Sequence, residues 1–337
     1  MAKYKRYNET RQPSLFDIDD DTDLVLNLPS QEQRPVAETH AEGDIAENSE
    51  TKEHKFLRFI SFGSGSSGNC SYVGTDEGGI LIDAGVDTKK VMESLKDYGI
   101  KPEDIKGVCI THDHGDHVRY AYNIVRKYKH IHIFCTNRAL NGMLRRHNIS
   151  RNIKEKHVAI YKEIPFTIAG LPLRLTAFEV PHDGTDNAGF FIECDDLRFA
   201  IATDIGHINE RAEFYISQAQ FVMLESNYDS KMLATGPYPE YLKKRIFDDN
   251  GHLDNEDAAR FIAKIYRPEL KYVFLCHLSK DNNTPEKALK CVSDALLAAG
   301  VKQVGDSSGS PYAMMAPVQL MALPRFDSTG LISLRLS

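Results

Sequence analysis

The sequence predicts an α/β sandwich. Short apolar runs of strand length recur from residue 56 onward, and glycine-rich or polar turns separate them. Between these runs lie longer segments in which apolar residues recur with the 3.6-residue period of a helix. Because the helical segments are interspersed irregularly among many strands, a sandwich is favoured over a strict βαβ repeat.

These patterns define the predicted elements in chain order. Strands are expected over residues 56–62, 79–82, 107–110, 132–135, 173–180, 188–194, 197–202, 221–225 and 271–276. Helices are expected over residues 88–98, 116–128, 137–147, 255–266 and 285–299. Asp87 can cap the first helix, which ends before Gly99, and either Asp254 or Asn255 can cap the fourth.

The chain of 337 residues divides into three predicted parts. Residues 1–54 are polar, hold 6 Lys/Arg against 13 Asp/Glu and show no sustained period, so we expect a disordered acidic tail. Residues 55–312 form one folded domain, and residues 313–337 form an apolar, proline-broken C-terminal extension. From residue 55 onward the chain carries 35 Lys/Arg and 35 Asp/Glu, so a nucleic-acid footprint would have to be a local basic patch.

The lengths of the apolar runs and the spacing of the cysteines indicate in which cellular compartment the protein is expected. The longest apolar stretches are far shorter than the roughly 20 residues that a membrane span needs, and the N-terminus lacks the apolar centre of a secretory signal. The six cysteines are scattered without a CxxC pair. We therefore expect a cytoplasmic protein with no membrane partner, in which the cysteines are reduced core thiols.

Four side chains that bind metals fall within six residues of one another, just after the strand predicted over 107–110: His112, His114, Asp116 and His117. His112 and His114 alternate, so they point the same way on extended backbone, while Asp116 and His117 turn inward as a helix begins. Burying several imidazoles and a carboxylate together is costly unless a cation pairs with them. The spacing therefore predicts two adjacent metal ions.

Single residues of the same chemical kind follow other apolar runs: Asp83, His182, Asp204 and His277. With the histidine-rich turn, they resemble the five ordered motifs of the metallo-β-lactamase superfamily. The resemblance implies an αββα sandwich, in which helices flank two mixed β-sheets, with residues 55–312 as the catalytic domain.

The resemblance also implies a ligand set. The ligands implied for the first metal ion are His112, His114 and His182. Those implied for the second ion are Asp116, His117 and His277, and Asp204 bridges the two. Asp83 is the carboxylate that orients the metal-binding turn.

Two divalent ions about 3.5–4 Å apart lower the pKa of a shared water and deliver hydroxide at neutral pH. Sites built from histidine and aspartate accept zinc, manganese and iron alike, so the sequence does not select the metal. In superfamily members that hydrolyse β-lactams a cysteine is usual in the second metal set, whereas glyoxalases, lactonases and nucleases use a bridging aspartate such as Asp204. Hydrolysis of β-lactams is therefore not expected.

His252 stands just before the helix predicted over 255–266, where backbone N–H groups favour an anion. It resembles the His-Leu segment that phosphodiesterases of the superfamily, such as tRNA 3′-processing nucleases, place at the scissile phosphate. Asp116 and His252 are accordingly the predicted catalytic residues, and His252 would protonate the leaving oxygen or contact the phosphate. The alternative is a surface histidine that caps the helix.

Two longer segments narrow the resemblance. Residues 62–69 and 277–285 are similar to the YycJ/WalJ-type bacterial metallo-hydrolases, for which a 5′→3′ DNA exonuclease activity linked to mismatch repair is proposed. In the first segment Ser66, Ser67 and Asn69 are candidate phosphate contacts, because small residues let backbone N–H groups approach a phosphate. An ordinary hairpin turn would explain the same residues.

The function expected from these motifs is that of a two-metal phosphodiesterase, a 5′→3′ DNA exonuclease in DNA repair, in which a metal-bridging hydroxide attacks phosphorus. A small-molecule metallo-hydrolase that cleaves a cyclic or simple phosphodiester, a thioester or a lactone is the main alternative. A non-catalytic metal-binding module is a third reading. Too few residues separate Asp204 from His277 for the large clamp domain of β-CASP nucleases, so the sequence leaves open how DNA would be held.

A short peptide in the tail points to a second partner besides DNA. Gln12, Leu15 and Phe16 lie in Gln-Pro-Ser-Leu-Phe, which resembles the Gln-x-x-Leu-Phe peptides by which bacterial replication and repair proteins dock on the sliding clamp. A disordered, accessible segment suits such a peptide. We therefore expect DNA as substrate and the sliding clamp as a docking partner.

Overall fold

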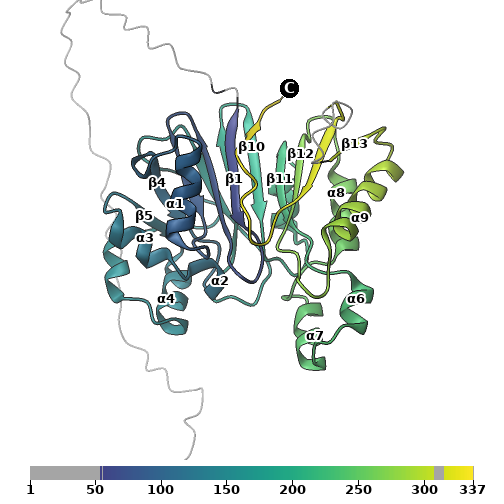
Figure 1. Cartoon of the computed structure of the whole chain (residues 1–337), viewed down its shortest axis with the longest axis horizontal. Coiled ribbons are helices and arrows are strands. Elements are labelled where there is room, and N and C mark those ends of the chain that lie inside the picture. The colour runs from purple at the N-terminus through teal and green to yellow at the C-terminus, as the bar shows by residue number, and fades with distance from the viewer. Residues whose placement is uncertain (1–53, 55, 307–314, 337) are drawn as a thin grey trace, which may run out of the picture. The chain divides into compact units, whose positions relative to one another are not determined.

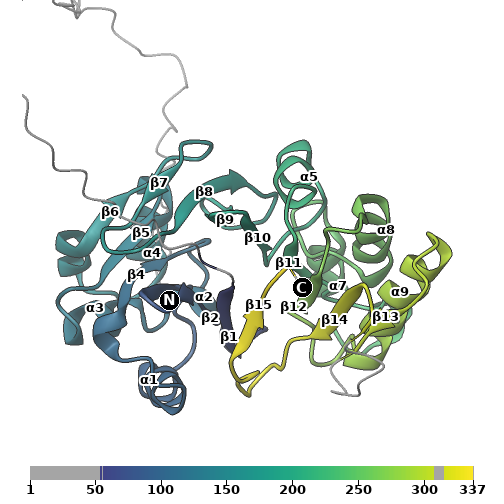
Figure 2. The ribbon, with the colours of Figure 1, turned by 90° about the horizontal axis from the view of Figure 1, so that it is seen from above.

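The computed structural model describes residues 54, 56–306 and 315–336. In this part of the chain two β-sheets lie face to face, and helices cover both outer faces, as Figures 1 and 2 show from two directions. The expected αββα sandwich is thereby confirmed. The peptide with Gln12, Leu15 and Phe16 lies outside the described residues. No described helix is long and apolar enough to cross a bilayer.

The first sheet has seven strands and is mixed. In spatial order they are β15 (Ile332–Leu334), β1 (Leu57–Gly63), β2 (Cys70–Thr75), β3 (Gly78–Ile82), β4 (Ile105–Cys109), β5 (His132–Cys135) and β6 (His157–Ala159). Pairing is antiparallel from β15 to β3 and parallel from β3 to β6.

The second sheet has eight strands and is mixed as well. In spatial order they are β13 (Val304–Gly305), β14 (Val318–Ala322), β12 (Tyr272–Cys276), β11 (Phe221–Glu225), β10 (Leu197–Ala202), β9 (Ala188–Cys194), β8 (Arg174–Glu179) and β7 (Phe166–Thr167). Pairing is parallel from β13 to β10 and antiparallel from β10 to β7.

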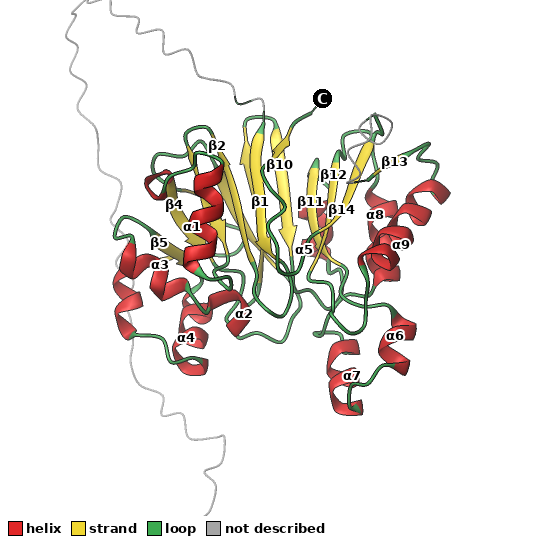
Figure 3. Ribbon diagram, viewed as in Figure 1, coloured by secondary structure: helices red, strands yellow, loops and turns green. Residues whose placement is uncertain are grey.

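Helices, coloured red in Figure 3, connect the parallel strands, and most of them form the outer layers. The α-helices are α1 (Thr88–Asp97), α2 (Gly115–Val118), α3 (Ala121–Lys127), α4 (Asn137–Arg146), α5 (Glu210–Ile216), α6 (Ser230–Thr235), α7 (Glu240–Phe247), α8 (Asn255–Ile265) and α9 (Pro285–Ala298). Two 3₁₀ helices accompany them, η1 (Pro102–Asp104) and η2 (Arg151–Lys156).

Among the described residues, apolar side chains form three large layers of core and one small cluster of Tyr228, Leu233 and Ile246. Between the sheets, Phe59 of β1 packs on Phe199 and Phe274 of the second sheet, with ring centroids 5.3 and 4.7 Å away. A second layer lies under α1, α3 and α4, and a third under α5, α8 and α9. Burial of this apolar surface holds the two sheets in place and fixes the strand ends that carry the site.

All nine predicted strands and four of the five predicted helices are confirmed, with ends shifted by at most two residues. Asp87 caps α1 and Asp254 caps α8, each by accepting backbone N–H bonds. The six cysteines are all free, and five of them are buried. Strands β2, β6, β7, β13, β14 and β15 and helices α5 to α7 were not predicted.

The single helix predicted over 116–128 is wrong, because the chain forms α2 and α3 with a break between them. In a continuous helix the N–H of Tyr120 would bond to the carbonyl of Asp116. Instead Tyr120 N donates to Ala84 O at 2.8 Å, and Asp116 O accepts from Asn69 N at 2.8 Å. The helix is therefore interrupted by hydrogen bonds to the two loops that enclose the predicted metal site.

The segment expected to be a C-terminal extension contributes a strand to each sheet. Strand β14 lies between β12 and β13, and β15 forms the edge of the first sheet beside β1. This segment therefore ties the two sheets together.

Candidate metal centre

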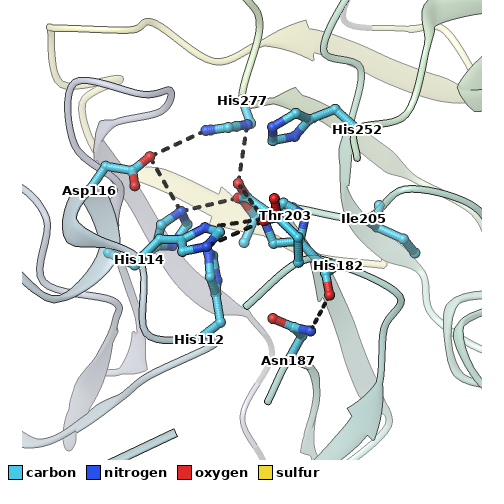
Figure 4. Close-up of polar contacts among 12 residues, drawn as sticks. His112, His114, Asp116, His182, Asn187, Thr203, Ile205, His252 and His277 are labelled. Atoms are coloured by element: carbon cyan, nitrogen blue, oxygen red, sulfur yellow. Dashed lines mark hydrogen bonds and ion pairs between the residues drawn. The ribbon is translucent and has the colours of Figure 1, made fainter. Parts of the chain in front are cut away.

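The predicted metal ligands come from loops at the ends of both sheets. The loop after β4 and the helix α2 carry His112, His114, Asp116 and His117. The second sheet contributes His182 after β8, Asp204 after β10 and His277 after β12. In Figure 4 the side chains labelled His112, His114, Asp116, His182 and His277 point toward one another.

Three neighbouring parallel strands explain why distant residues of the second sheet meet. Strands β10, β11 and β12 pair side by side in parallel. The carboxyl ends of parallel strands lie at the same edge of a sheet, so the residues that follow these strands lie close together. Asp204, Glu225 and His277 occupy these three ends.

His112, His114 and His182 form what we call the three-histidine group. One ring nitrogen of each lies within 4.8 Å of the others, and Nε2 of His182 is 3.3 Å from Nδ1 of His114. Nδ1 of His182 donates to the carbonyl of Gly251 at 2.9 Å. Nδ1 of His112 lies 3.0 Å from the Thr111 hydroxyl. In His112 and His182 these contacts leave Nε2 for a metal ion.

Asp116, His117, Asp204 and His277 form what we call the acid-paired group. Nε2 of His117 lies 3.1 Å from Oδ2 of Asp204, and Nε2 of His277 lies 3.5 Å from Oδ2 of Asp116. The other oxygen of Asp204 lies 3.7 Å from Nε2 of His182. The two oxygens of Asp204 therefore face both groups.

The donor set fits divalent cations. Among the described residues, Nε2 of His112 and Nε2 of His277 are both buried without a hydrogen-bond partner. A metal ion bound to each nitrogen would supply the missing partner. Nδ1 of His117 lies 2.7 Å from Oδ2 of Asp83, which directs Nε2 toward Asp204. Imidazole nitrogens without hydrogen-bond partners, next to carboxylates, are suitable ligands for two metal ions.

Two of the residues that build this centre have a left-handed backbone. Asp83 has φ 61° and His277 has φ 53°, which is unfavourable for residues with a Cβ. The Thr111 N–H and hydroxyl both donate to Asp83, at 2.8 and 3.0 Å, and His277 N donates to the Ser64 hydroxyl at 2.9 Å. The surrounding loops hold both residues in this conformation.

The three-histidine group is electrically neutral at neutral pH. Burial lowers the pKa of His112 well below its usual value, and the neighbouring His117 lowers it further. Burial, with His182 beside it, lowers the pKa of His114 to about 4. Burial likewise lowers the pKa of His182. Neutral imidazoles have the free electron pairs that metal binding requires.

Carboxylates reverse this effect in the acid-paired group. Burial opposes the charge on His117, yet Asp204 and Asp83 raise its pKa well above the usual value. Burial is likewise overcome at His277, where Asp204, Asp116 and Glu225 raise the pKa to about 10. Burial also opposes the charge on Asp204, but His277 and His117 hold its pKa well below the usual value. This group therefore favours positive charge.

A sequence profile of the beta-lactamase superfamily domain matches residues 79–277, the stretch that carries all the predicted metal ligands. The chain belongs to this superfamily. Exodeoxyribonuclease YycJ of Bacillus anthracis is 34% identical over 244 residues, which cover 72% of this chain and 90% of that protein. Exodeoxyribonuclease WalJ of Streptococcus pneumoniae is 32% identical over 233 residues, which cover 69% of this chain and 85% of that protein.

A solved structure supports the same fold. The metallo-beta-lactamase fold protein YhfI from Bacillus subtilis superimposes with a TM-score of 0.58 at 11% identity, covering 81% of this chain and 98% of that one. With the buried clusters of histidine and aspartate, these relationships identify the chain as a metal-dependent hydrolase of the beta-lactamase superfamily.

In this superfamily member Glu225 is a site residue that the sequence analysis missed. It is fully buried at the end of β11, and its Oε1 lies 2.8 Å from Nδ1 of both His252 and His277. Its Oε2 accepts the N–H of Ile205 at 2.8 Å. One signal was available, since β10, β11 and β12 each lead from an apolar run into a polar ligand-type residue.

His252 lies inside the centre and not at the surface. Its side chain is 15% exposed, and its ring lies 5.1 Å from that of His182 and 5.2 Å from that of His277. The alternative of a helix-capping histidine is wrong, because Asp254 caps α8. Nδ1 of His252 donates to Glu225, which leaves Nε2 for a substrate atom.

The three candidate phosphate contacts lie at different depths. Asn69 is buried, with Nδ2 2.9 Å from Nε2 of His117 and 3.3 Å from Oδ2 of Asp116. Ser66 and Ser67 are exposed on the adjoining loop. Of the three, only Asn69 contacts the candidate metal ligands.

A second residue that the sequence analysis left without a role is Asp183. Its Oδ1 lies 3.3 Å from Nε2 of His114, and its Oδ2 lies 2.7 Å from Nε of Arg245 on α7. Burial opposes the charge on Asp183, but Arg245 and His182 hold its pKa below the usual value. Asp183 therefore joins α7 to the three-histidine group.

Proposed function

We propose that this hydrolase is a two-metal phosphodiesterase that degrades DNA as a 5′→3′ exonuclease in DNA repair. The position of Asp204 carries the proposal, because its two oxygens lie 3.1 Å from His117 and 3.7 Å from His182, in the two different groups. A carboxylate shared in this way suits a pair of ions acting together on one phosphodiester. The names of the two exodeoxyribonuclease relatives support DNA as the substrate.

The donor atoms suggest which residues would hold which ion. The first ion would take His112, His114 and His182; the second would take Asp116, His117 and His277; Asp204 would contact both. When bound, such ions lower the pKa of a shared water to near neutrality and stabilise negative charge on phosphoryl oxygens. Zinc, manganese and iron all suit this donor set.

The remaining site residues would orient ligands and move a proton. Asp83 fixes the ring of His117 through their 2.7 Å contact. Glu225 holds Nδ1 of His252 at 2.8 Å, and in this orientation Nε2 of His252 would donate a proton to the leaving oxygen of the cleaved diester. Asp116 would act as a ligand at the reacting phosphate. His252 and Asp116 are thus the catalytic residues of the proposal.

Duplex DNA labelled at one end or the other tests the proposal directly. With Mn²⁺ or Zn²⁺, a 5′→3′ exonuclease releases a 5′ label at once as mononucleotide and shortens a 3′-labelled strand progressively. His114→Ala should abolish both signals, while Arg174→Ala, an exposed change on β8, should leave them intact. Hydrolysis of bis(p-nitrophenyl) phosphate without DNA degradation would favour a small-molecule hydrolase. Inactivity toward both would favour a binding module.

Docking on a sliding clamp through Gln12, Leu15 and Phe16 stays a prediction, since these residues lie outside the described part of the chain. Leu15→Ala with Phe16→Ala should remove measurable affinity for the purified clamp. Unchanged affinity would contradict the prediction.

A further inference from the structure

Positive charge is concentrated in one segment of the folded domain. Residues 119–156 contain ten Lys/Arg and a single acid, Glu155, whereas residues 55–337 as a whole contain 35 of each sign. A charged surface is usually mixed, so this segment departs strongly from the rest of the domain. It forms strand β5 of the first sheet and the helices α3, α4 and η2, which pack on the outer side of that sheet.

Part of this charge lines a pocket of about 620 Å³ between α4, η2 and the loop after β8. Its charged residues are Arg138 and Arg145 on α4 and Arg151 and Lys154 on η2, and all four are exposed. Among the residues that the structure describes, no acidic side chain lines the pocket. Four cations gathered without a counter-charge repel one another, and a polyanion would relieve that repulsion.

Most of the donors of these side chains are uncommitted. Arg138 donates to Thr185 O at 3.4 Å and Arg145 to the Thr185 hydroxyl at 3.5 Å, both long for hydrogen bonds. Within the described ranges, none of the four cations pairs with a carboxylate. A guanidinium has five N–H donors in a planar fork that matches phosphate oxygens, so the pocket retains most of its capacity for an anion.

The pocket adjoins the metal centre through one buried residue. Thr185 donates its N–H and its hydroxyl to the carboxylate of Asp113, at 2.8 and 2.6 Å. Asp113 is fully buried between the ligands His112 and His114. On the other side, α4 packs so closely that a Cβ on Gly142 would lie 2.0 Å from Asp113 Oδ2. The pocket therefore lies next to the loop that carries the candidate ligands His112 and His114.

We propose that this pocket binds the sugar–phosphate backbone of the DNA strand whose end is cut at the metal centre. The inference rests on the proposed function, and it supplies the basic footprint that a neutral domain without a separate clamp domain needs. The pocket is open and its cations are spread over two elements, which suits successive phosphates better than one small anion. Contacts of this kind hold DNA without reading its sequence.

Binding and cleavage are measured separately with metal-loaded full-length protein. The test variant is Arg151→Ala with Lys154→Ala, in the pocket. The matched control is Arg126→Ala with Lys127→Ala on α3, which removes the same charge from the same segment at exposed positions outside the pocket. A fluorescent phosphorothioate duplex, which resists cleavage, reports affinity by anisotropy over a series of salt concentrations.

The pocket variant should bind the duplex about 10-fold or more weakly. The slope of log affinity against log salt should fall by about 2, one unit for each phosphate that the variant no longer neutralises. Its hydrolysis of bis(p-nitrophenyl) phosphate should be unchanged, because that diester is too small to reach the pocket. The control should change affinity less than about 2-fold.

Equal losses of DNA affinity in the pocket variant and in the control would overturn the inference. They would show that DNA responds to the overall positive charge of the segment and does not bind in the pocket. Unchanged affinity in the pocket variant, or no binding by the unmodified protein, would overturn it too. If the pocket variant binds DNA more weakly but the unmodified protein does not degrade DNA, the result would support the pocket as a DNA-binding site and refute the exonuclease proposal.

Discussion

The three-histidine group and the acid-paired group lie side by side, yet they hold charge in opposite ways. Burial keeps His112 and His114 neutral, whereas carboxylates draw a proton onto His117 and His277. The pKa values differ because the two groups have different numbers of acidic neighbours. Asp204 lies between both groups, whereas Asp116 and Asp83 lie beside His117 of the acid-paired group. The acid-paired group is therefore the stronger attractor of a cation, and Asp204 couples the two groups.

The largest effect is expected from Asp204→Ala, which removes the carboxylate between the groups. We expect kcat on bis(p-nitrophenyl) phosphate to fall on the order of 10³-fold, about 4 kcal/mol of transition-state stabilisation. Metal analysis should find fewer than two ions per chain. A variant that retains two ions and normal turnover would show that the groups do not depend on Asp204.

His252→Ala should lower the rate of DNA cleavage by about 10²-fold, within the range of general acid catalysis, and leave the metal content unchanged. The loss should be much smaller with bis(p-nitrophenyl) phosphate, whose nitrophenolate leaves without protonation. Glu225→Gln should show the same dependence on the leaving group, because Glu225 positions His252, together with weaker metal binding, because Glu225 also contacts His277. Equal losses on both substrates would contradict proton donation.

Asp83→Asn should weaken one group and spare the other. Loss of the charge beside His117 should reduce metal affinity of the acid-paired group by about 10-fold, the lower end of the range for residues behind a ligand. Titration with a competing chelator should resolve one weakened ion and one unchanged ion. If both ions weaken equally, the two groups bind metal as a single unit.

Asn69→Ala should have the smallest effect of the four. Its amide lies against Asp116 and His117, so we expect the KM for DNA to rise about 3-fold with kcat nearly constant, the effect of removing one hydrogen bond. Ser66→Ala with Ser67→Ala is the matched control on the same loop. A larger effect in the serine variant would move the phosphate contact to the exposed part of the loop.

Local pattern was enough to predict much of this protein. Strands such as β9, β10 and β11 were predicted to the residue, since a run of apolar residues bounded by turns is a local signal. The cluster from His112 to His117 could also be predicted from the sequence, because its candidate ligands are neighbours in the chain. Strand β2 was missed, because its small and polar residues gain their burial from β1 and β3 on either side.

The sequence by itself determined which residues are the candidates for the metal site: the histidine-rich turn, Asp83, His182, Asp204 and His277. Only the tertiary structure decided how they are assembled. Glu225 acquired a role because parallel pairing puts the end of β11 between Asp204 and His277, and the helix over 116–128 broke because Asp116 and Tyr120 bond to distant loops. Arg138 and Lys154 met in one pocket for the same reason. Chemical identity is local, whereas contacts between residues far apart in the chain depend on packing that no short segment specifies.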